Sequence, residues 1–339
     1  MKIIVDAFGG DHAPLEIMKG CAQAVQELDL DIILTGKEQA IRRVAKQNNI
    51  SLYRMEIVDT PDVISMTDPA GAIMKAKAQS SMAVGLKLLA QGKGDAFLSG
   101  GNSGALVMGS SLLIKRIKGI KRASFGAIMP KAEGFMMLMD GGANIDCRPE
   151  MLQQFGIMGS IYMEKVMNIK NPRVGLVNVG TEEQKGSELQ QQAYLLLKNS
   201  PVHFVGNIEG RDIPDDAADV IVADGFTGNI LLKTYEGVAM MIMKQVKQVM
   251  TKNTKNKLAA LVMRSDFMEL KGRMDYNEYG GAPVMGVCKP VFKAHGSSKA
   301  HTVKNALRLT KAYVETNVID VITKSIQELN TRYPVTQQG

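Results

Sequence analysis

Short apolar runs alternate with glycine-rich turns and amphipathic stretches along this chain, and this alternation constrains its fold more than any other feature. Five runs lie at residues 3–5, 31–34, 136–139, 174–177 and 220–222. Continuous runs of this length are typical of strands buried on both faces. Four amphipathic stretches that predict helices lie at residues 14–28, 82–91, 187–198 and 229–250. The alternation predicts an α/β fold with a doubly wound, largely parallel sheet and helices on both faces.

The length of 339 residues fits one large α/β domain. We expect it to span residues 1–333, with two lobes around a cleft, and a short tail at 334–339. An apolar share of 45% and a charged share of 22% are ordinary for a soluble globular protein. The three cysteines form no CxxC pair, which favours a reducing compartment. With no leader and no membrane-spanning run in the sequence, we expect a cytoplasmic protein.

Glycine is abundant, and many of the 33 glycines follow the apolar runs directly. Loops after parallel strands emerge at one edge of the sheet, where ligands bind in open α/β folds. Glycine lets backbone N–H groups approach an anion closely, and a following helix N-terminus adds partial positive charge. A tight turn alone explains the glycines of any single loop. The whole set of turns, with Asn and Ser beside the glycines, predicts a binding site for phosphate or an oxyanion.

The sequence lacks the motifs of several common classes of enzyme. Neither the dinucleotide motif GxGxxG nor the P-loop motif GxxxxGK[ST] occurs. The turn at 101–105 approaches a nucleophile elbow but ends in Ala, so Ser103 fits an anion-binding hydroxyl better than a nucleophile. Cys147 is more typical of a packed side chain than of a reactive thiol. The four histidines lack metal-ligand spacing, and His12 and His295, both in glycine turns, are candidate donors to phosphate or the acyl group.

Positive charge is concentrated in one segment. The formal net charge of the chain is +7, and residues 243–274 carry eight Lys or Arg against Asp266 and Glu269. A second basic cluster lies at residues 115–122. Such patches suit an acidic partner or an anionic surface, although a solvated helix face explains either cluster equally well. We expect no nucleic-acid partner.

Seven ordered motifs resemble one family. They lie at residues 6–14, 99–105, 140–144, 178–186, 206–212, 224–229 and 294–298. In this order they resemble the PlsX-type phosphate acyltransferases of bacterial phospholipid synthesis, and the resemblance extends from Met1 to about Gln327. It implies a fold like that of isocitrate and isopropylmalate dehydrogenases, a homodimer, and no metal or nicotinamide cofactor.

The resemblance also implies a reaction. A long-chain fatty acyl group would pass from acyl carrier protein to inorganic phosphate, and the acyl phosphate would go to a membrane glycerol-3-phosphate acyltransferase. Phosphate is already anionic near neutral pH, so it can attack a thioester without a strong general base. Two alternatives stay open: a short-chain phosphate acyltransferase that uses acyl-CoA, and a membrane-associated scaffold without catalysis.

Two residues are candidates for catalysis within these motifs. Lys185 would position phosphate, unless it pairs with Glu182 or Glu183. Asn229 would donate to the oxyanion, unless it caps a helix. The remaining candidates for binding phosphate or the acyl group are His12, Gly101, Asn102, Ser103, Gly104, Asn144, Gly180, Thr181, Asp224, Gly228 and His295.

The basic segment at 243–274 combines charge with an apolar stripe. Its candidate docking residues are Lys252, Lys255, Lys257, Leu258, Leu261 and Val262. This combination suits peripheral contact with the anionic inner face of the cell membrane, and it equally suits an acidic carrier protein. A helix with its apolar side buried between lobes or subunits is the other interpretation.

Overall fold

The computed structural model describes residues 1–274 and 280–332. The tail expected at 334–339 lies outside the described residues. The strands are β1 (Lys2–Asp6), β2 (Asp31–Gly36), β3 (Met55–Asp59), β4 (Ala96–Ser99), β5 (Ser124–Pro130), β6 (Phe135–Met139), β7 (Arg173–Asn178), β8 (His203–Glu209), β9 (Val220–Val222), β10 (Gly281–Met285) and β11 (Val291–Ala294).

Helices alternate with these strands. The α-helices are α1 (Leu15–Leu28), α2 (Glu38–Gln47), α3 (Ser81–Ala90), α4 (Ser103–Gly109), α5 (Pro149–Lys165), α6 (Glu188–Lys198), α7 (Gly225–Thr251), α8 (Thr254–Val262), α9 (Arg264–Met274), α10 (Ala300–Glu315) and α11 (Val318–Arg332). Three short helical segments complete the set: η1 (Ala70–Met74), η2 (Ser110–Lys115) and η3 (Ile213–Asp215).

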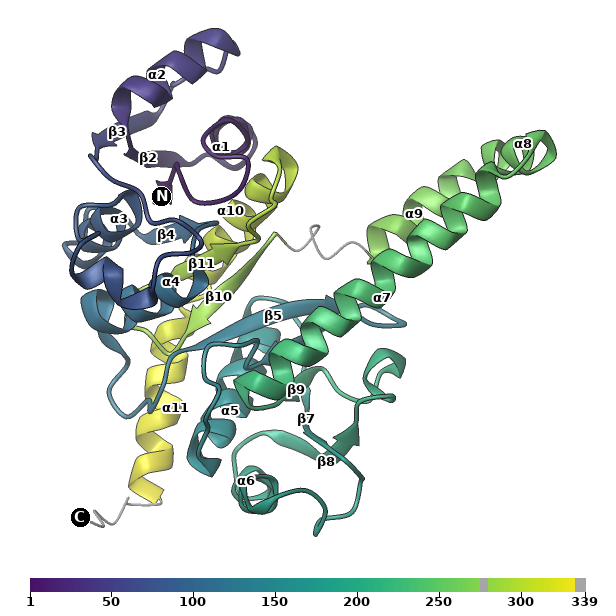
Figure 1. Cartoon of the computed structure of the whole chain (residues 1–339). Coiled ribbons are helices and arrows are strands. Elements are labelled where there is room, and N and C mark those ends of the chain that lie inside the picture. Colours follow the sequence, from purple (N-terminus) through teal and green to yellow (C-terminus); the bar gives the residue numbers. More distant parts are fainter. Residues whose placement is uncertain (275–279, 333–339) are drawn as a thin grey trace.

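All eleven strands belong to one continuous sheet, in the order β3-β2-β1-β4-β11-β10-β5-β6-β9-β7-β8. The strands from β3 to β11 are parallel to one another, as are β6, β9, β7 and β8. The pairs β11–β10, β10–β5 and β5–β6 are antiparallel. Two parallel halves that run in opposite directions are therefore joined by an antiparallel centre (Figure 1).

The predicted α/β class and doubly wound sheet are confirmed. All five apolar runs lie in strands, and the four amphipathic stretches correspond to α1, α3, α6 and α7 within a few residues. Alternate residues of β1 belong to different cores: Ile3 and Val5 pack on one face of the sheet, and Ile4 packs on the other. Helices α1, α5, α10 and α11 contribute to the first core, and α3 and α4 to the second.

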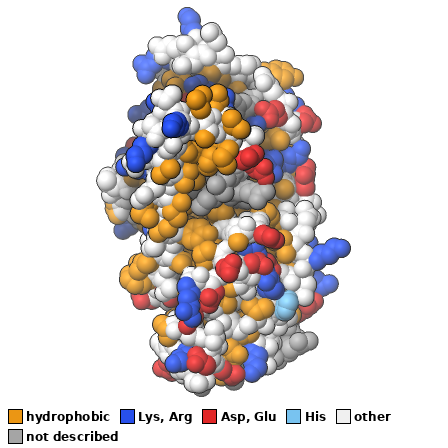
Figure 2. Space-filling model, turned by 90° about the vertical axis from the view of Figure 1, so that its right-hand side faces the viewer, with side chains coloured by type: hydrophobic (Ala, Val, Ile, Leu, Met, Phe, Trp, Pro, Cys, Tyr) orange, Lys and Arg blue, Asp and Glu red, His pale blue; other side chains and the backbone are white. Residues whose placement is uncertain are grey.

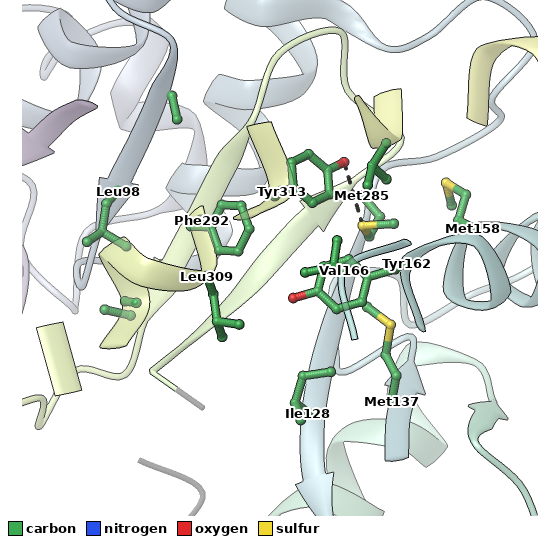
Figure 3. Close-up of a cluster of buried hydrophobic side chains, with 14 of the residues drawn as sticks. Leu98, Ile128, Met137, Met158, Tyr162, Val166, Met285, Phe292, Leu309 and Tyr313 are labelled. Atoms are coloured by element: carbon green, nitrogen blue, oxygen red, sulfur yellow. Dashed lines mark hydrogen bonds between the residues drawn. The ribbon is translucent and has the colours of Figure 1, made fainter. Parts of the chain in front are cut away.

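Aromatic and methionine side chains join the two halves of the sheet in the main core (Figure 3). The ring centroid of Tyr313, on α10, lies 5.4 Å from that of Phe292 on β11 and 5.9 Å from that of Tyr162 on α5. The Tyr313 hydroxyl donates to the sulfur of Met285 on β10, with a donor–acceptor distance of 3.9 Å. These contacts hold α10, α5 and the central strands together, so the halves share one buried interior.

Helix α7 leaves the body of the protein and, with α8 and α9, forms a projection (Figure 1). Of its 27 residues only Gly225 and Gly228 are buried. Figure 2 views the molecule from the side toward which the projection points, and hydrophobic side chains gather there beside Lys and Arg. Within residues 1–274 and 280–332, no helix combines the length and apolar character needed to cross a membrane.

Candidate active site

Three glycine turns of the first half meet at the ends of β1, β4 and β11. The amide of Asp11 donates to the carbonyl of Gly296 at 2.8 Å. A Cβ on Gly9 would lie 2.7 Å from the amide nitrogen of Gly101 and 2.6 Å from Ser99 Oγ, and one on Gly100 would lie 2.6 Å from the carbonyl of Gly9. Side chains larger than glycine would therefore force these turns apart.

Two turns of the second half meet after β6 and β9. The amide of Gly225 donates to the carbonyl of Asn144 at 2.7 Å. Gly142 has a φ of +122°, which favours glycine, and a Cβ there would lie 3.1 Å from the Cβ of Asn229. The first turns of α7 are thus held against the loop after β6.

A pocket of about 450 Å³ lies between the two groups of turns. Apolar side chains that line it come from β5, α7 and the loop between β3 and η1: Phe125, Ala127, Ile128, Leu232 and Met66. Its charged and polar lining residues are Asp11, Ser103, Asn229, Lys233, Glu236, Lys293, His295, Ser297 and Thr302. An apolar wall beside a group of cations and donors suits a ligand with an apolar part and an anionic part.

Ser103, Asn229 and His295 are the predicted side chains that line this pocket. Asn229 does not cap a helix, because α7 begins at Gly225 and the side chain of Asp224 accepts from the amide of Thr227 at 2.9 Å. In the described part of the chain, no hydrogen bond engages the Asn229 amide group. Asn229 is therefore able to donate into the pocket.

Several other predicted residues shape the turns. The Asn102 side chain caps α4 through the amide of Ala105 at 3.0 Å, and its NH₂ group donates to carbonyls of the loop at 65–68. Asn144 donates to the carboxylate of Asp140 at 2.9 Å and to the carbonyl of Ala123 at 2.8 Å. These amides position backbone, and neither residue lines the pocket.

The remaining first-half candidates lie in the backbone of the turns or beside them. The amide of Gly101 donates to Ser99 Oγ at 3.0 Å. A Cβ on Gly104 would lie 3.2 Å from the Cβ of Ala70, so α4 packs closely on η1. His12 is exposed in the first turn and does not line the pocket.

Lys185, Gly180 and Thr181 belong to the loop between β7 and α6, and none of them lines the pocket. Lys185 is exposed. Glu183, one of its two expected partners, instead forms an ion pair with Lys198 at 3.1 Å. Within the described residues Lys185 forms no ion pair.

The motif-based prediction missed four charged residues of the pocket: Asp11, Lys233, Glu236 and Lys293. Lys233 and Glu236 follow Asn229 by four and seven residues, which places all three on one helix face. Lys293 follows Val291 and Phe292 within a buried strand, where an unpaired lysine is rare. Helical spacing was the signal that could have identified Lys233 and Glu236, and a lysine inside an apolar run was the signal for Lys293. Asp11 lies in the first glycine turn, beside the candidate His12.

The electrostatics of the site argue against a thiol nucleophile. Burial raises the pKa of the Cys147 thiol to about 12, and the Cys147 sulfur donates to the carbonyl of Asn144 at 3.4 Å. Burial, together with the nearby Lys233, lowers the pKa of His295, so its imidazole is neutral near pH 7. No cluster of three or more His, Cys, Asp or Glu suited to a metal ion occurs in residues 1–274 and 280–332.

Solved structures with low sequence identity share this fold. A phosphotransacetylase from Streptococcus pyogenes matches with a TM-score of 0.63 and 17% identity over 93% of this chain and 94% of its own. A putative 4-hydroxythreonine-4-phosphate dehydrogenase from Salmonella typhimurium matches with a TM-score of 0.53 and 12% identity over 92% and 98% of the two chains. The second match agrees with the expected dehydrogenase-like fold.

Sequence relatives are much more similar. The phosphate acyltransferase of Acetivibrio thermocellus is 48% identical over 95% of both chains. That of Thermoanaerobacterium thermosaccharolyticum is 46% identical over 96% of this chain and 97% of its own. The family model described as "Fatty acid synthesis protein" matches residues 1–321. The chain therefore belongs to this family, the PlsX-type phosphate acyltransferases, and it is an enzyme of that type in fatty acid and phospholipid synthesis.

Proposed function

We propose that the enzyme transfers a long-chain fatty acyl group from acyl carrier protein to inorganic phosphate, and that phosphate attacks the thioester directly. The observation that carries this proposal is a single pocket with an apolar wall and a group of cations and hydrogen-bond donors. The apolar wall suits the acyl chain, and the polar side suits phosphate and the thioester carbonyl.

In the proposed step, a phosphate oxygen forms a bond to the carbonyl carbon and the carbon–sulfur bond breaks. The electron pair of that bond leaves with sulfur, and the thiolate then takes a proton. No covalent enzyme adduct is needed, which agrees with the protonated, hydrogen-bonded thiol of Cys147. The enzyme would act by holding phosphate beside the carbonyl and by stabilising the oxyanion that develops.

Asn229 and Lys185 are the residues that we assign to these two tasks. The Asn229 amide lines the pocket and would donate to the oxyanion. Lys185 would attract and position phosphate, and the absence of an ion pair among the described residues leaves its charge available. Its loop follows β7, which lies parallel to β9 beside the strand ends that place Asn229.

The projection is the part of the enzyme that we assign to docking. Leu258, Leu261 and Val262 on α8 are 62%, 66% and 84% exposed, and Lys252, Lys255 and Lys257 lie beside them. We propose that this tip contacts the anionic inner face of the cell membrane, close to a membrane glycerol-3-phosphate acyltransferase that takes the product.

The shaft of the projection suits a different contact. The large exposed apolar residues of α7 are Phe226, Ile230, Val238, Met240, Met241, Ile242 and Val249. Exposed apolar surface of this extent along one helix fits an interface between two copies, and we propose that the enzyme is a homodimer.

The decisive test measures thiol release from long-chain acyl carrier protein as inorganic phosphate is varied. Release that saturates with phosphate, together with an acyl phosphate product, is the expected result. If the enzyme instead prefers short-chain acyl-CoA, the acyl donor is acyl-CoA and not acyl carrier protein. No acyl phosphate from either thioester would leave only the scaffold interpretation, and an acylated side chain on the enzyme would contradict direct attack.

A further inference from the structure

Lys293 is a partly buried cation whose charge has no carboxylate partner among the described residues. It lies on β11, next to Ser99 of β4 in the parallel pairing, and it lines the pocket. Its ammonium group donates to the carbonyl of Gly100 at 3.1 Å and to that of Ala294. In residues 1–274 and 280–332 it forms no ion pair.

The hydrogen bonds of Lys293 leave donor capacity for a ligand. An ammonium group has three N–H donors, and the two carbonyls accept two of them. Asp6, the carboxylate of β1, accepts from Ser99 Oγ at 2.7 Å and from the amide of Phe8 at 3.1 Å, and it forms no ion pair with Lys293 among the described residues. Lys293 therefore has one N–H without a protein acceptor among the described residues.

The other charged groups around the pocket differ from Lys293. Lys233 pairs with Glu236 at 2.8 Å, and the side chain of Lys233 is 55% exposed. Asp11 and His295 complete the titratable groups that face Lys293 from neighbouring turns. A partly buried charge without an ion-pair partner costs free energy, and an anionic ligand that enters the pocket would reduce that cost.

We propose that Lys293 is the anion-binding residue of the pocket and that its ammonium group holds an oxygen of inorganic phosphate. This inference rests on the proposed function, because it takes phosphate as the acceptor. It adds a lysine within the pocket, on a strand of the sheet, to Lys185, which lies on an exposed loop and does not line the pocket. A charge-assisted hydrogen bond of this kind is shorter and stronger than one between neutral groups.

Burial makes this contact sensitive to pH. Desolvation, followed by the charge of Lys233, lowers the pKa of Lys293 to about 8, while Asp11 and Asp6 act in the opposite direction. Below this pKa the side chain is charged and binds the anion. As the pH rises above it, Lys293 loses its proton while inorganic phosphate stays dianionic, so phosphate affinity falls.

The test measures binding of inorganic phosphate to the full chain without an acyl donor, by calorimetry or by ³¹P NMR titration at constant ionic strength. Lys293→Met should weaken phosphate binding by about tenfold or more, the range expected for a hydrogen bond to a charged group. The matched control is Lys299→Met, which removes an exposed charge close in sequence and outside the pocket. This control should bind phosphate as the wild type does.

A second measurement uses only the wild type, in case Lys293→Met fails to fold. Phosphate affinity should fall as the pH is raised from 7.5 to 9.5, on either side of the pKa of about 8. Binding by Lys293→Met within twofold of wild type, or a flat pH series, would overturn the role of Lys293 and leave phosphate as the acceptor. If the wild type neither binds phosphate nor needs it for thiol release, the proposed function fails as well.

Discussion

Gly228 lies directly against the carbonyl oxygen of Asp140, so that a Cβ on Gly228 would be 2.0 Å from that oxygen. This approach seats the first turn of α7 on the loop after β6. It also sets the position of the next residue, Asn229, at the edge of the pocket. The oxyanion donor that we propose is thus placed by a glycine that does not itself line the pocket.

Gly228→Ala should lower both turnover and stability. The new methyl group collides with backbone, which cannot rotate away, so α7 must move. Overpacking of this kind costs about 1–3 kcal/mol, and a displacement of about 1 Å at a reacting group can cost about a hundredfold in rate. Steady-state kinetics and urea unfolding at neutral pH measure the two effects.

Gly237→Ala is the matched control on the same helix. No atom lies within 4 Å of a Cβ at Gly237. Because alanine favours helix over glycine, this variant should gain about 0.5–1 kcal/mol and keep its turnover. If Gly228→Ala and Gly237→Ala have the same turnover and the same free energy of unfolding, the close contact of Gly228 with Asp140 does not position α7.

Asn229→Ala should lower turnover by about a hundredfold or more, as loss of one oxyanion donor does in other acyl transfer enzymes. The amide lines the pocket and keeps no protein partner among the described residues, so its loss should leave folding intact. Gln248→Ala removes an exposed amide elsewhere on α7 and serves as the control. Near-native turnover of Asn229→Ala would remove Asn229 from the mechanism.

The sequence predicted the helices and strands of this fold well. A strand buried on both faces and an amphipathic helix each have a pattern that is visible in residues close together in the sequence. The run at 3–5 became β1, with alternate side chains in separate cores. The antiparallel centre was not predicted. Strands β10 and β11 pair with β5 and β4, which are more than 150 residues earlier, and no local pattern encodes such partners.

The candidate site also has a part that the sequence predicted and a part that it did not. Glycine turns were visible as motifs, and several of them, though not the turn at 178–186, lie around one pocket. Whether a polar side chain faces that pocket or braces a turn depends on contacts distant in sequence. Asn102 and Asn144 brace turns, whereas Asn229 faces the pocket. Residue type alone could not separate these roles.

Lys185→Ala should raise the KM for phosphate and lower turnover, if this exposed lysine positions the acceptor. Its side chain packs on Gly180, where a Cβ would lie 3.1 Å from Lys185 Cγ, and truncation leaves the loop backbone bonds intact. Lys170→Ala removes a comparably exposed lysine elsewhere and should change neither parameter. Initial rates at varied phosphate decide the matter, and unchanged values for Lys185→Ala would exclude Lys185 from phosphate positioning.

Asp219 should make stability depend on acid pH. It pairs with Lys131 at 2.7 Å and with Arg173 at 3.0 Å, and these cations hold its pKa well below the usual range despite partial burial. A depressed folded-state pKa means that its contribution is present above the unfolded pKa, near 4, and is lost as the pH falls further.

The variant Asp219→Ala tests this at neutral pH. The side chain of Lys131 is only 5% exposed, and the substitution removes one of its two carboxylate partners. Asp216 still pairs with Lys131. We expect a loss of about 3 kcal/mol in the free energy of unfolding, and a smaller dependence on pH between 5 and 2. Asp212→Ala breaks only an exposed pair with Arg211 and should cost less than about 1 kcal/mol. Equal losses would show that burial of Lys131 has no effect.

Leu258→Glu should abolish salt-sensitive binding to anionic liposomes if the tip of the projection docks on a membrane. The leucine is 62% exposed on α8, where no residue is buried, so the change should not affect folding. A carboxylate there would be repelled by anionic lipid and would remove apolar contact. Leu195→Glu alters a leucine that is 50% exposed on α6, away from the projection, and should sediment with liposomes as the wild type does. If Leu258→Glu binds liposomes as the wild type does, the apolar residues of the tip do not enter the bilayer. The basic tip would then be assigned to a protein partner instead.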